Sequence, residues 1–173
     1  MAITIVTTAG SATANSYATI AETDEYALST VWQSTWAALS DEEKNSILVR
    51  AARSLDTIGF HGRPTADSQA LEFPRTEAYY PSGNMYSTTL VPQTIADAQM
   101  HIACYLSKDI TEDPFEISDA SNVKKEKFID VVGEKEYWQK QASDGSEFLS
   151  GVIAPMLRNT GLLGPASSVR LTR

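Results

Sequence analysis

Residues 40–76 read SDEEKNSILVRAARSLDTIGFHGRPTADSQALEFPRT, and this stretch carries the strongest structural signals in the chain. Ser40 and Glu43 have the spacing of a capping box, in which each side chain bonds a backbone N–H at the start of a helix. The stretch therefore predicts a helix with one buried face, followed by a polar loop that ends in Phe73-Pro74-Arg75. The apolar face recurs at helical spacing up to Gly59 and comprises Ile47, Leu48, Ala51, Ala52, Leu55 and Ile58.

The same reasoning places a helix on either side of this one. Thr19 and Glu22 repeat the capping-box spacing and predict a first helix over residues 20–29. Trp32 and Trp36 follow in a short connector, where we expect them to anchor the core. Pro92 suits the first turn of a third helix, which should pack against the second. The apolar face of the third helix comprises Ile95, Ala98, Ile102, Tyr105 and Leu106.

The rest of the chain is less regular. Residues 2–8 show a β-favouring alternation, so residues 1–16 predict an N-terminal strand or arm. The long aromatic loop over residues 59–90 is either ordered by its own contacts or used for binding. Partial alternation over residues 123–138 predicts a β-hairpin or extended arm. Residues 147–158 predict a short amphipathic helix that is interrupted by Gly151 and Pro155. Residues 169–173 predict a strand that is completed by a neighbour.

Together these elements predict a mainly α protein. We expect a small bundle of three to four helices with long loops and a β-hairpin or extended arm in the C-terminal half. A chain of 173 residues, 42% hydrophobic, is expected to form one domain over residues 1–173. Within it, the helical core covers about residues 17–108, the arm about 120–140, and the C-terminal helix and tail about 146–173.

The sequence gives no sign of membrane insertion or export. Residues 1–6 are too short for a signal-peptide core, and nowhere do eighteen apolar residues run together. The single Cys104 excludes an intramolecular disulfide framework and agrees with a reducing compartment. We therefore expect a soluble protein that folds in a cytoplasm.

Motifs for catalysis and cofactor binding are missing. There is no phosphate-binding loop, dinucleotide fingerprint, nucleophile elbow or zinc-protease helix. His101 and Cys104 lie three residues apart, but a structural zinc site needs four ligands and His61 is the only other histidine. Arg50 and Arg53 could clamp a carboxylate or phosphate, or form structural ion pairs. We expect no enzyme, no cofactor and no metal.

Charge is distributed unevenly along the chain. Residues 1–43 hold six acidic and no basic residues, residues 44–76 three acidic and five basic, and residues 77–173 thirteen acidic and nine basic, for a net charge of −8. A protein that neutralises nucleic-acid phosphates normally carries a basic stripe. The nearest candidate comprises Lys124, Lys125 and Lys127. Acidic residues are interspersed with these lysines, so we interpret the segment as a solvated surface of mixed charge.

An ordered set of short motifs runs along the chain. It comprises Asn15-Ser16-Tyr17, Trp36-x-x-Leu39-Ser40-Asp41-x-Glu43-Lys44, Ala51-x-Arg53-x-Leu55-Asp56, Gly62-Arg63 and Gln69-Ala70-Leu71-x-Phe73-Pro74-Arg75, with Ala154-Pro155-Met156-Leu157 and Val169-Arg170 near the end. This set resembles a known family, the head-to-tail connector adaptors of tailed bacteriophages. A closely similar set of phage proteins carries the label DnaT-like single-strand-binding protein. The resemblance covers about residues 14–106 and, more loosely, the end of the chain.

The resemblance implies a virion structural protein at the head–tail interface, present in the host cytoplasm during assembly. Such a protein forms a ring, commonly a dodecamer, under the portal protein and joins it to a stopper or tail-completion protein while genomic DNA passes through the lumen. An acidic ring agrees with this role because it would not retain the phosphates. The candidate subunit or portal interface comprises Arg50, Arg53, Phe73, Pro74 and Arg75.

The alternative function is a single-stranded nucleic-acid-binding module that acts in replication. Such a module needs a basic groove with aromatic side chains on which bases stack. The net acidity of the chain counts against this alternative. The loop that contains Tyr79, Tyr80 and Tyr86 is the one place where the sequence offers a site for it.

Overall fold

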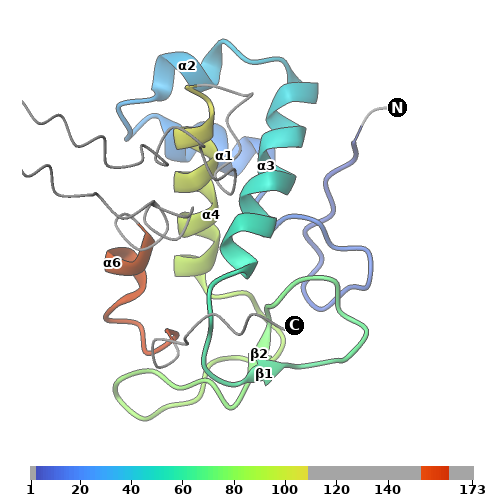
Figure 1. Ribbon diagram of the computed structural model, residues 1–173, viewed down its shortest axis with the longest axis vertical. Helices are drawn as coiled ribbons and strands as arrows, with labels where there is room; N and C mark the ends of the chain where they lie inside the picture. Colours follow the sequence, from blue (N-terminus) through green and yellow to red (C-terminus); the bar gives the residue numbers. More distant parts are fainter. Residues whose placement is uncertain (1–2, 109–152, 164–173) are drawn as a thin grey trace, which may run out of the picture.

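The computed structural model describes residues 3–108 and 153–163, which form a mainly helical fold (Figure 1). This confirms the predicted fold class. The predicted arm at 120–140 and the predicted terminal strand at 169–173 lie outside the described residues. In the described ranges the elements are α1 (Ile20–Ala27), α2 (Gln33–Ala37), α3 (Asp41–Asp56), the antiparallel pair β1 (Arg63–Pro64) and β2 (Arg75–Thr76), α4 (Gln93–Leu106) and α6 (Ala154–Leu157).

Both predicted capping boxes are present. At the start of α3, the Ser40 backbone N–H donates to Glu43 Oε2 at 2.8 Å, and the Glu43 N–H donates to Ser40 Oγ at 3.4 Å. Thr19 and Glu22 make the same reciprocal pair at the start of α1. These bonds satisfy backbone N–H groups that have no partner inside the helix. Both helices therefore begin where the capping boxes in the sequence predicted. Pro92 is the N-cap of α4, one position before the predicted first turn.

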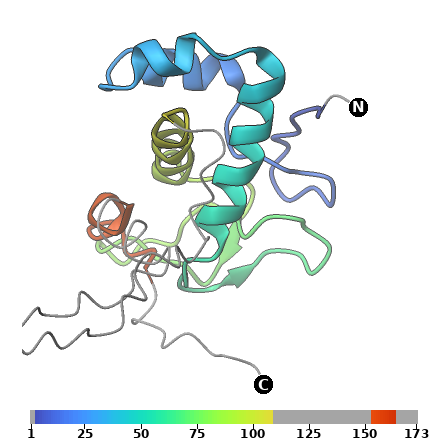
Figure 2. The same ribbon diagram turned by 45° about the horizontal axis from the view of Figure 1, so that its top comes forward.

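Helices α3 and α4 pack side by side and form the centre of the core, while α1 and α2 cover one end of the pair (Figures 1 and 2). Alanines on the facing sides allow the two backbones to approach closely, and larger aliphatic side chains fill the space around them. This confirms the predicted packing of the second helix against the third. The fully buried residues of the interface include Leu48, Ala51, Ala52, Leu55, Ile95, Ala98, Ile102 and Ala103.

The predicted connector between the first two long helices is itself a short helix, α2, so that expectation was wrong. A five-residue helix shows little periodicity, and Trp32 at its N-cap makes no side-chain cap bond that the sequence could signal. Trp36 is a core anchor as predicted, with 1% of its surface exposed. Its indole N–H and the Lys44 ammonium both donate to Asp24 Oδ1, at 2.7 and 2.8 Å.

The N-terminal residues form an arm rather than a strand. Residues 3–8 have no strand pairing, and Asn15 holds them by accepting from the Val6 N–H at 2.8 Å and donating to the Thr4 carbonyl at 2.9 Å. Buried Gln99 on α4 then accepts from the Tyr17 N–H at 2.6 Å and donates to the Leu48 carbonyl at 2.9 Å. These bonds attach the arm to both central helices.

Residues 153–163 complete the core from the far end of the chain. Ile153, Leu157 and Leu162 are fully buried, and Leu163 forms an isolated antiparallel bridge with Phe60. Of the predicted helix over residues 147–158, residues 154–157 are helical as α6, with Pro155 in the first turn, and residues 147–152 lie outside the described residues. Among the described residues, no helix has the length and apolar character needed to cross a membrane.

Candidate functional site

The loop after α3 is held by a half-buried carboxylate, that of Asp56, at the C-terminal end of that helix. Asp56 Oδ1 accepts from the Tyr17 hydroxyl at 2.5 Å, and Asp56 Oδ2 accepts from the Glu72 N–H at 3.3 Å. The Tyr17 oxygen in turn accepts from the Phe73 N–H at 3.3 Å. Burial raises the pKa of Asp56 to about 6, against the opposing effect of the two hydrogen bonds. Burial and the neighbouring Asp56 charge also raise the pKa of Tyr17.

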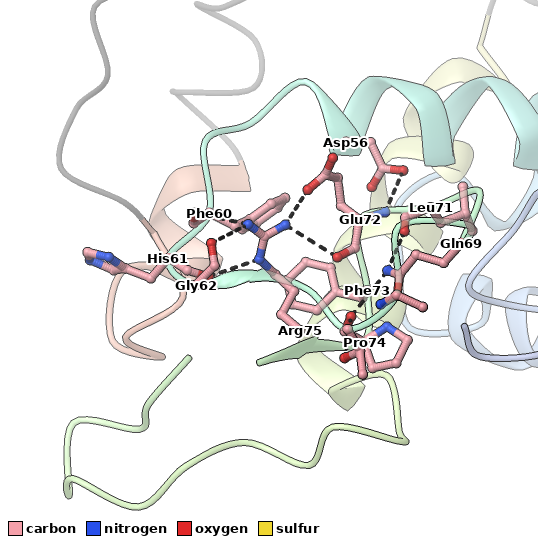
Figure 3. Close-up of polar contacts among 12 residues, drawn as sticks. Asp56, Phe60, His61, Gly62, Gln69, Leu71, Glu72, Phe73, Pro74 and Arg75 are labelled. Carbon is pink, nitrogen blue, oxygen red and sulfur yellow. Dashed lines mark hydrogen bonds and ion pairs between the residues drawn. The ribbon is translucent and has the colours of Figure 1, made fainter. Parts of the chain in front are cut away.

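Arg75 binds the two sides of this loop together (Figure 3). Its guanidinium donates to the carbonyls of His61 at 2.9 Å, Gly62 at 2.7 Å and Phe60 at 3.4 Å. It also pairs with the Glu72 carboxylate. A guanidinium presents five N–H donors in a fixed plane, so one side chain can fix several backbone segments at once. The Arg75 charge is therefore satisfied inside the chain.

The structure places the five predicted interface residues in two groups. Phe73 and Arg75 are 2% and 6% exposed, and Pro74, which follows a cis peptide bond, is also buried. Arg50 and Arg53 lie on α3, where Arg53 is exposed and Arg50 half-buried. Phe73, Pro74 and Arg75 therefore order the loop within the chain. A role for any of the five residues in contacts between subunits stays a prediction.

The tyrosine loop, residues 79–86, forms a tight hairpin-like turn on the surface. The Gly83 N–H donates to the Tyr80 carbonyl at 2.9 Å, and the Tyr80 N–H donates to the Asn84 carbonyl at 2.8 Å. The ring of Tyr80 stacks on that of Tyr86, with centroids 3.6 Å apart and planes at 26°. Tyr86 is buried, whereas Tyr79 and Tyr80 are 49% and 44% exposed. The loop thus presents two aromatic side chains on an ordered backbone.

The turn after α6 contacts the tyrosine loop and helps to position it. The Tyr86 hydroxyl donates to the Thr160 carbonyl at 2.7 Å. Gly161 has a φ of +74°, and a Cβ atom at this position would lie 2.4 Å from the Tyr79 carbonyl oxygen. Arg158, the C-cap of α6, is exposed and precedes Thr160 by two residues. The loop therefore has an exposed basic side chain in the segment that supports it.

Neither member of the His101 and Cys104 pair is placed as a metal ligand. Cys104 is fully buried, which raises the pKa of its thiol to about 11. His101 Nδ1 lies 3.2 Å from the Tyr26 hydroxyl, and burial lowers the pKa of the imidazole, so it is neutral at pH 7. Within residues 3–108 and 153–163, no three His, Cys, Asp or Glu side chains are grouped to hold a metal ion.

A second aromatic cluster, which the sequence reasoning missed, lies beside the C-terminal half of α4. Trp32 contacts the rings of His101 and Tyr105 edge to face, with centroids 5.1 and 5.8 Å apart. Lys108 places its ammonium 3.7 Å from the centroid of Tyr105. The signal was available, because residues 101, 105 and 108 are spaced to lie on one face of a helix. We call Trp32, His101, Tyr105 and Lys108 the α4 cluster.

Ion pairing reduces the positive charge that the described surface can offer. Lys44, Arg63 and Arg75 are each paired with a carboxylate, Asp24, Glu77 and Glu72 respectively. For Asp24, burial would raise the pKa, but the bonds from Lys44 and Trp36 lower it overall. The exposed cations therefore lie at separate positions and form no stripe in the described part of the chain; they include Arg53, Lys108 and Arg158.

Comparison with known proteins places the chain in a family. A family described as "Putative DnaT-like ssDNA binding protein" matches residues 1–173, the whole chain. Neither the curated proteins nor the solved structures contain a match. Because the family match extends over every element described above, this chain belongs to the DnaT-like ssDNA-binding protein family.

Proposed function

We propose that this protein binds single-stranded nucleic acid and that bases stack on Tyr79 and Tyr80 of the tyrosine loop. The observation that carries the proposal is the family match over the whole chain. The loop adds a suitable surface, because its two exposed rings are held on an ordered turn and Arg158 lies in the supporting segment. Stacking on aromatic side chains contributes roughly 1–3 kcal/mol per base and tolerates any sequence.

The distribution of exposed positive charge determines how strongly the proposed binding should depend on salt. Among the described residues, Arg158 is the exposed cation in the segment that supports the loop, so we expect one or two phosphates to be neutralised. The logarithm of the binding constant for a single strand falls by about 0.7 per neutralised phosphate for each tenfold rise in salt. We therefore expect a shallow salt dependence, with stacking rather than counterion release supplying most of the affinity.

The test is fluorescence anisotropy of the full chain with a labelled oligothymidylate at low salt, followed by a salt titration. We expect binding to the single strand, weaker binding to a duplex of equal length, and a slope of about −1. Tyr79→Ala with Tyr80→Ala should weaken binding about tenfold or more. Leu90→Ala is a matched control, because Leu90 is an exposed apolar residue just outside the loop. No binding at low salt would exclude the proposal.

A second candidate is the head-to-tail adaptor role that the phage resemblance implies. Two observations favour it. The described surface exposes several large apolar side chains, among them Leu28, Val31 and Leu90 at 65%, 87% and 65% exposure. The chain is also acidic, with a net charge of −8, which suits a ring through which DNA slides. In this proposal the partners are further copies of the chain, a portal protein and a stopper or tail-completion protein.

Native mass spectrometry of the protein alone and with its portal tests the adaptor role. A ring of about twelve copies on the portal is expected, and a strict monomer that shows no portal binding would exclude the role. The portal must be present because such a ring can require it for assembly. The oligonucleotide experiment distinguishes the two candidates, since an adaptor that lets DNA pass has no need of a base-stacking loop.

A further inference from the structure

We propose that the α4 cluster is a second base-stacking site for the same single strand, with Lys108 neutralising the phosphate beside the bound base. This inference rests on the proposed nucleic-acid-binding function and adds a site to it. Neither the family description nor the resemblance names these residues. The cluster joins α2 to α4, whereas the tyrosine loop precedes the N-terminus of α4.

The geometry of the cluster suits an aromatic ligand. Trp32, His101 and Tyr105 meet edge to face, so their ring planes are nearly perpendicular, at 77° and 85°. All three residues are half-buried, and Trp32 and Tyr105 pack against the core. Val31, next to Trp32, is 87% exposed and extends the apolar surface. A base placed there would cover apolar area that water now contacts.

Charge at the cluster also favours a nucleotide. Lys108 is exposed, and its ammonium lies over the Tyr105 ring at 3.7 Å, within the range of a cation–π interaction. Because His101 is neutral at pH 7, Lys108 is the cation that the cluster offers to a phosphate.

The two stacking sites lie toward opposite ends of α4. That helix has 14 residues, and at about 1.5 Å per residue its ends are about 21 Å apart. A stacked strand rises about 3.4 Å per nucleotide, so about six nucleotides span this length. A strand of about four nucleotides should therefore occupy one site, and a strand of about fifteen should reach both.

The experiment is photo-crosslinking of the full chain to 5-bromouracil oligonucleotides of about four and about fifteen nucleotides, with mass spectrometry of the crosslinked peptides. With the longer strand we expect crosslinks in the peptides that carry Trp32 or Tyr105, as well as in the tyrosine loop. Lys108→Glu should weaken binding of the longer strand about fivefold. Arg53→Glu, which makes the same change of charge at an exposed site on α3, should change it less than twofold.

Each outcome has a separate meaning. Crosslinks confined to the tyrosine loop, or equal effects of Lys108→Glu and Arg53→Glu, would overturn the second site and leave the proposed function intact. No binding of either strand at low salt would overturn both. Trp32→Phe provides a further variant that keeps an aromatic ring in the core; loss of the Trp32 crosslink with retained binding would support the assignment.

Discussion

The environment of the Asp56 carboxylate differs between the folded and the unfolded chain. Its carboxylate is enclosed by Tyr17 and the backbone of residues 72–73, and burial raises its pKa from 3.8 to about 6. A raised pKa means that the folded state binds the proton more tightly. The contribution of Asp56 to the free energy of unfolding is therefore fully present below about pH 4 and is lost as the pH rises through 6.

Asp56→Asn should remove this pH dependence. In the wild-type chain, the Asp56 contribution should fall by about 3 kcal/mol between pH 3 and pH 7, at about 1.36 kcal/mol for each pKa unit between 3.8 and about 6. Asparagine does not titrate, so the difference in unfolding free energy between the two proteins should change by this amount. Urea denaturation at several pH values measures it, with the exposed Asp67→Asn as control. A constant difference across this range would contradict the assignment.

Arg75 stabilises the loop through bonds that lysine cannot reproduce. Arg75→Ala leaves Glu72 and several carbonyls without their donor, and we expect a loss of about 3–5 kcal/mol in unfolding free energy. Arg75→Lys keeps the charge but not the planar set of donors, so it should recover only part of the loss. Denaturation midpoints test this, with the exposed Arg53→Lys as control. An unchanged midpoint together with lost assembly would instead assign Arg75 to an intersubunit contact.

At the scale of elements, the capping boxes explain why the helices were predictable. Thr19 with Glu22 and Ser40 with Glu43 are local signals, and the bonds they predict span three residues. The contacts of the loop were not predictable in this way. Arg75 binds backbone carbonyls of residues 60–62, and any residue type supplies a carbonyl, so the sequence carries no sign of the partners. Tyr17 and Asp56 meet across 39 positions.

The same distinction applies to the candidate sites. The sequence identified the tyrosine loop because its aromatic residues are close together in the chain. It could not say that Tyr86 is buried while Tyr79 and Tyr80 are exposed, since this depends on the turn after α6. The helical spacing of residues 101, 105 and 108 signalled part of the α4 cluster, but nothing in the sequence placed Trp32, the N-cap of α2, beside them.

Gly161 couples the turn after α6 to the tyrosine loop, and substituting it should disturb the loop. In Gly161→Ala, the new Cβ would lie 2.4 Å from the Tyr79 carbonyl, in addition to the strain of a positive φ. Gly83→Ala is a matched control, because Gly83 has a φ of +87° but nothing within 4 Å of its Cβ position. Strain alone costs about 1–3 kcal/mol.

Hydrogen exchange would separate the two glycine variants. The Tyr86 N–H, which donates to the Ala78 carbonyl, should lose protection in Gly161→Ala. In Gly83→Ala the loss should be confined to the tip of the turn. Equal exchange in both variants would mean that the contact with Gly161 does not position the loop.

At the scale of the whole molecule, the core depends on a short segment far along the chain. A chain that ends at residue 152 lacks three fully buried side chains, Ile153, Leu157 and Leu162. At about 1.5–3 kcal/mol each, with the sum an upper estimate, their loss approaches the 5–15 kcal/mol that typically stabilises a domain. We expect weak cooperativity on unfolding and binding of a hydrophobic dye. A chain that ends at residue 163 keeps these three side chains and is the control.

The placement of residues 153–163 also has a consequence for biosynthesis. These residues close the core around α4 and support the tyrosine loop, although 44 residues separate them from Lys108. A ribosome completes α3 and α4 well before it reaches them, so the nascent chain carries an unfinished apolar face during that interval. The core of the described residues is therefore complete only after Leu162 and Leu163 have left the ribosome, and we expect the tyrosine loop to gain its contacts with Thr160 and Gly161 only then.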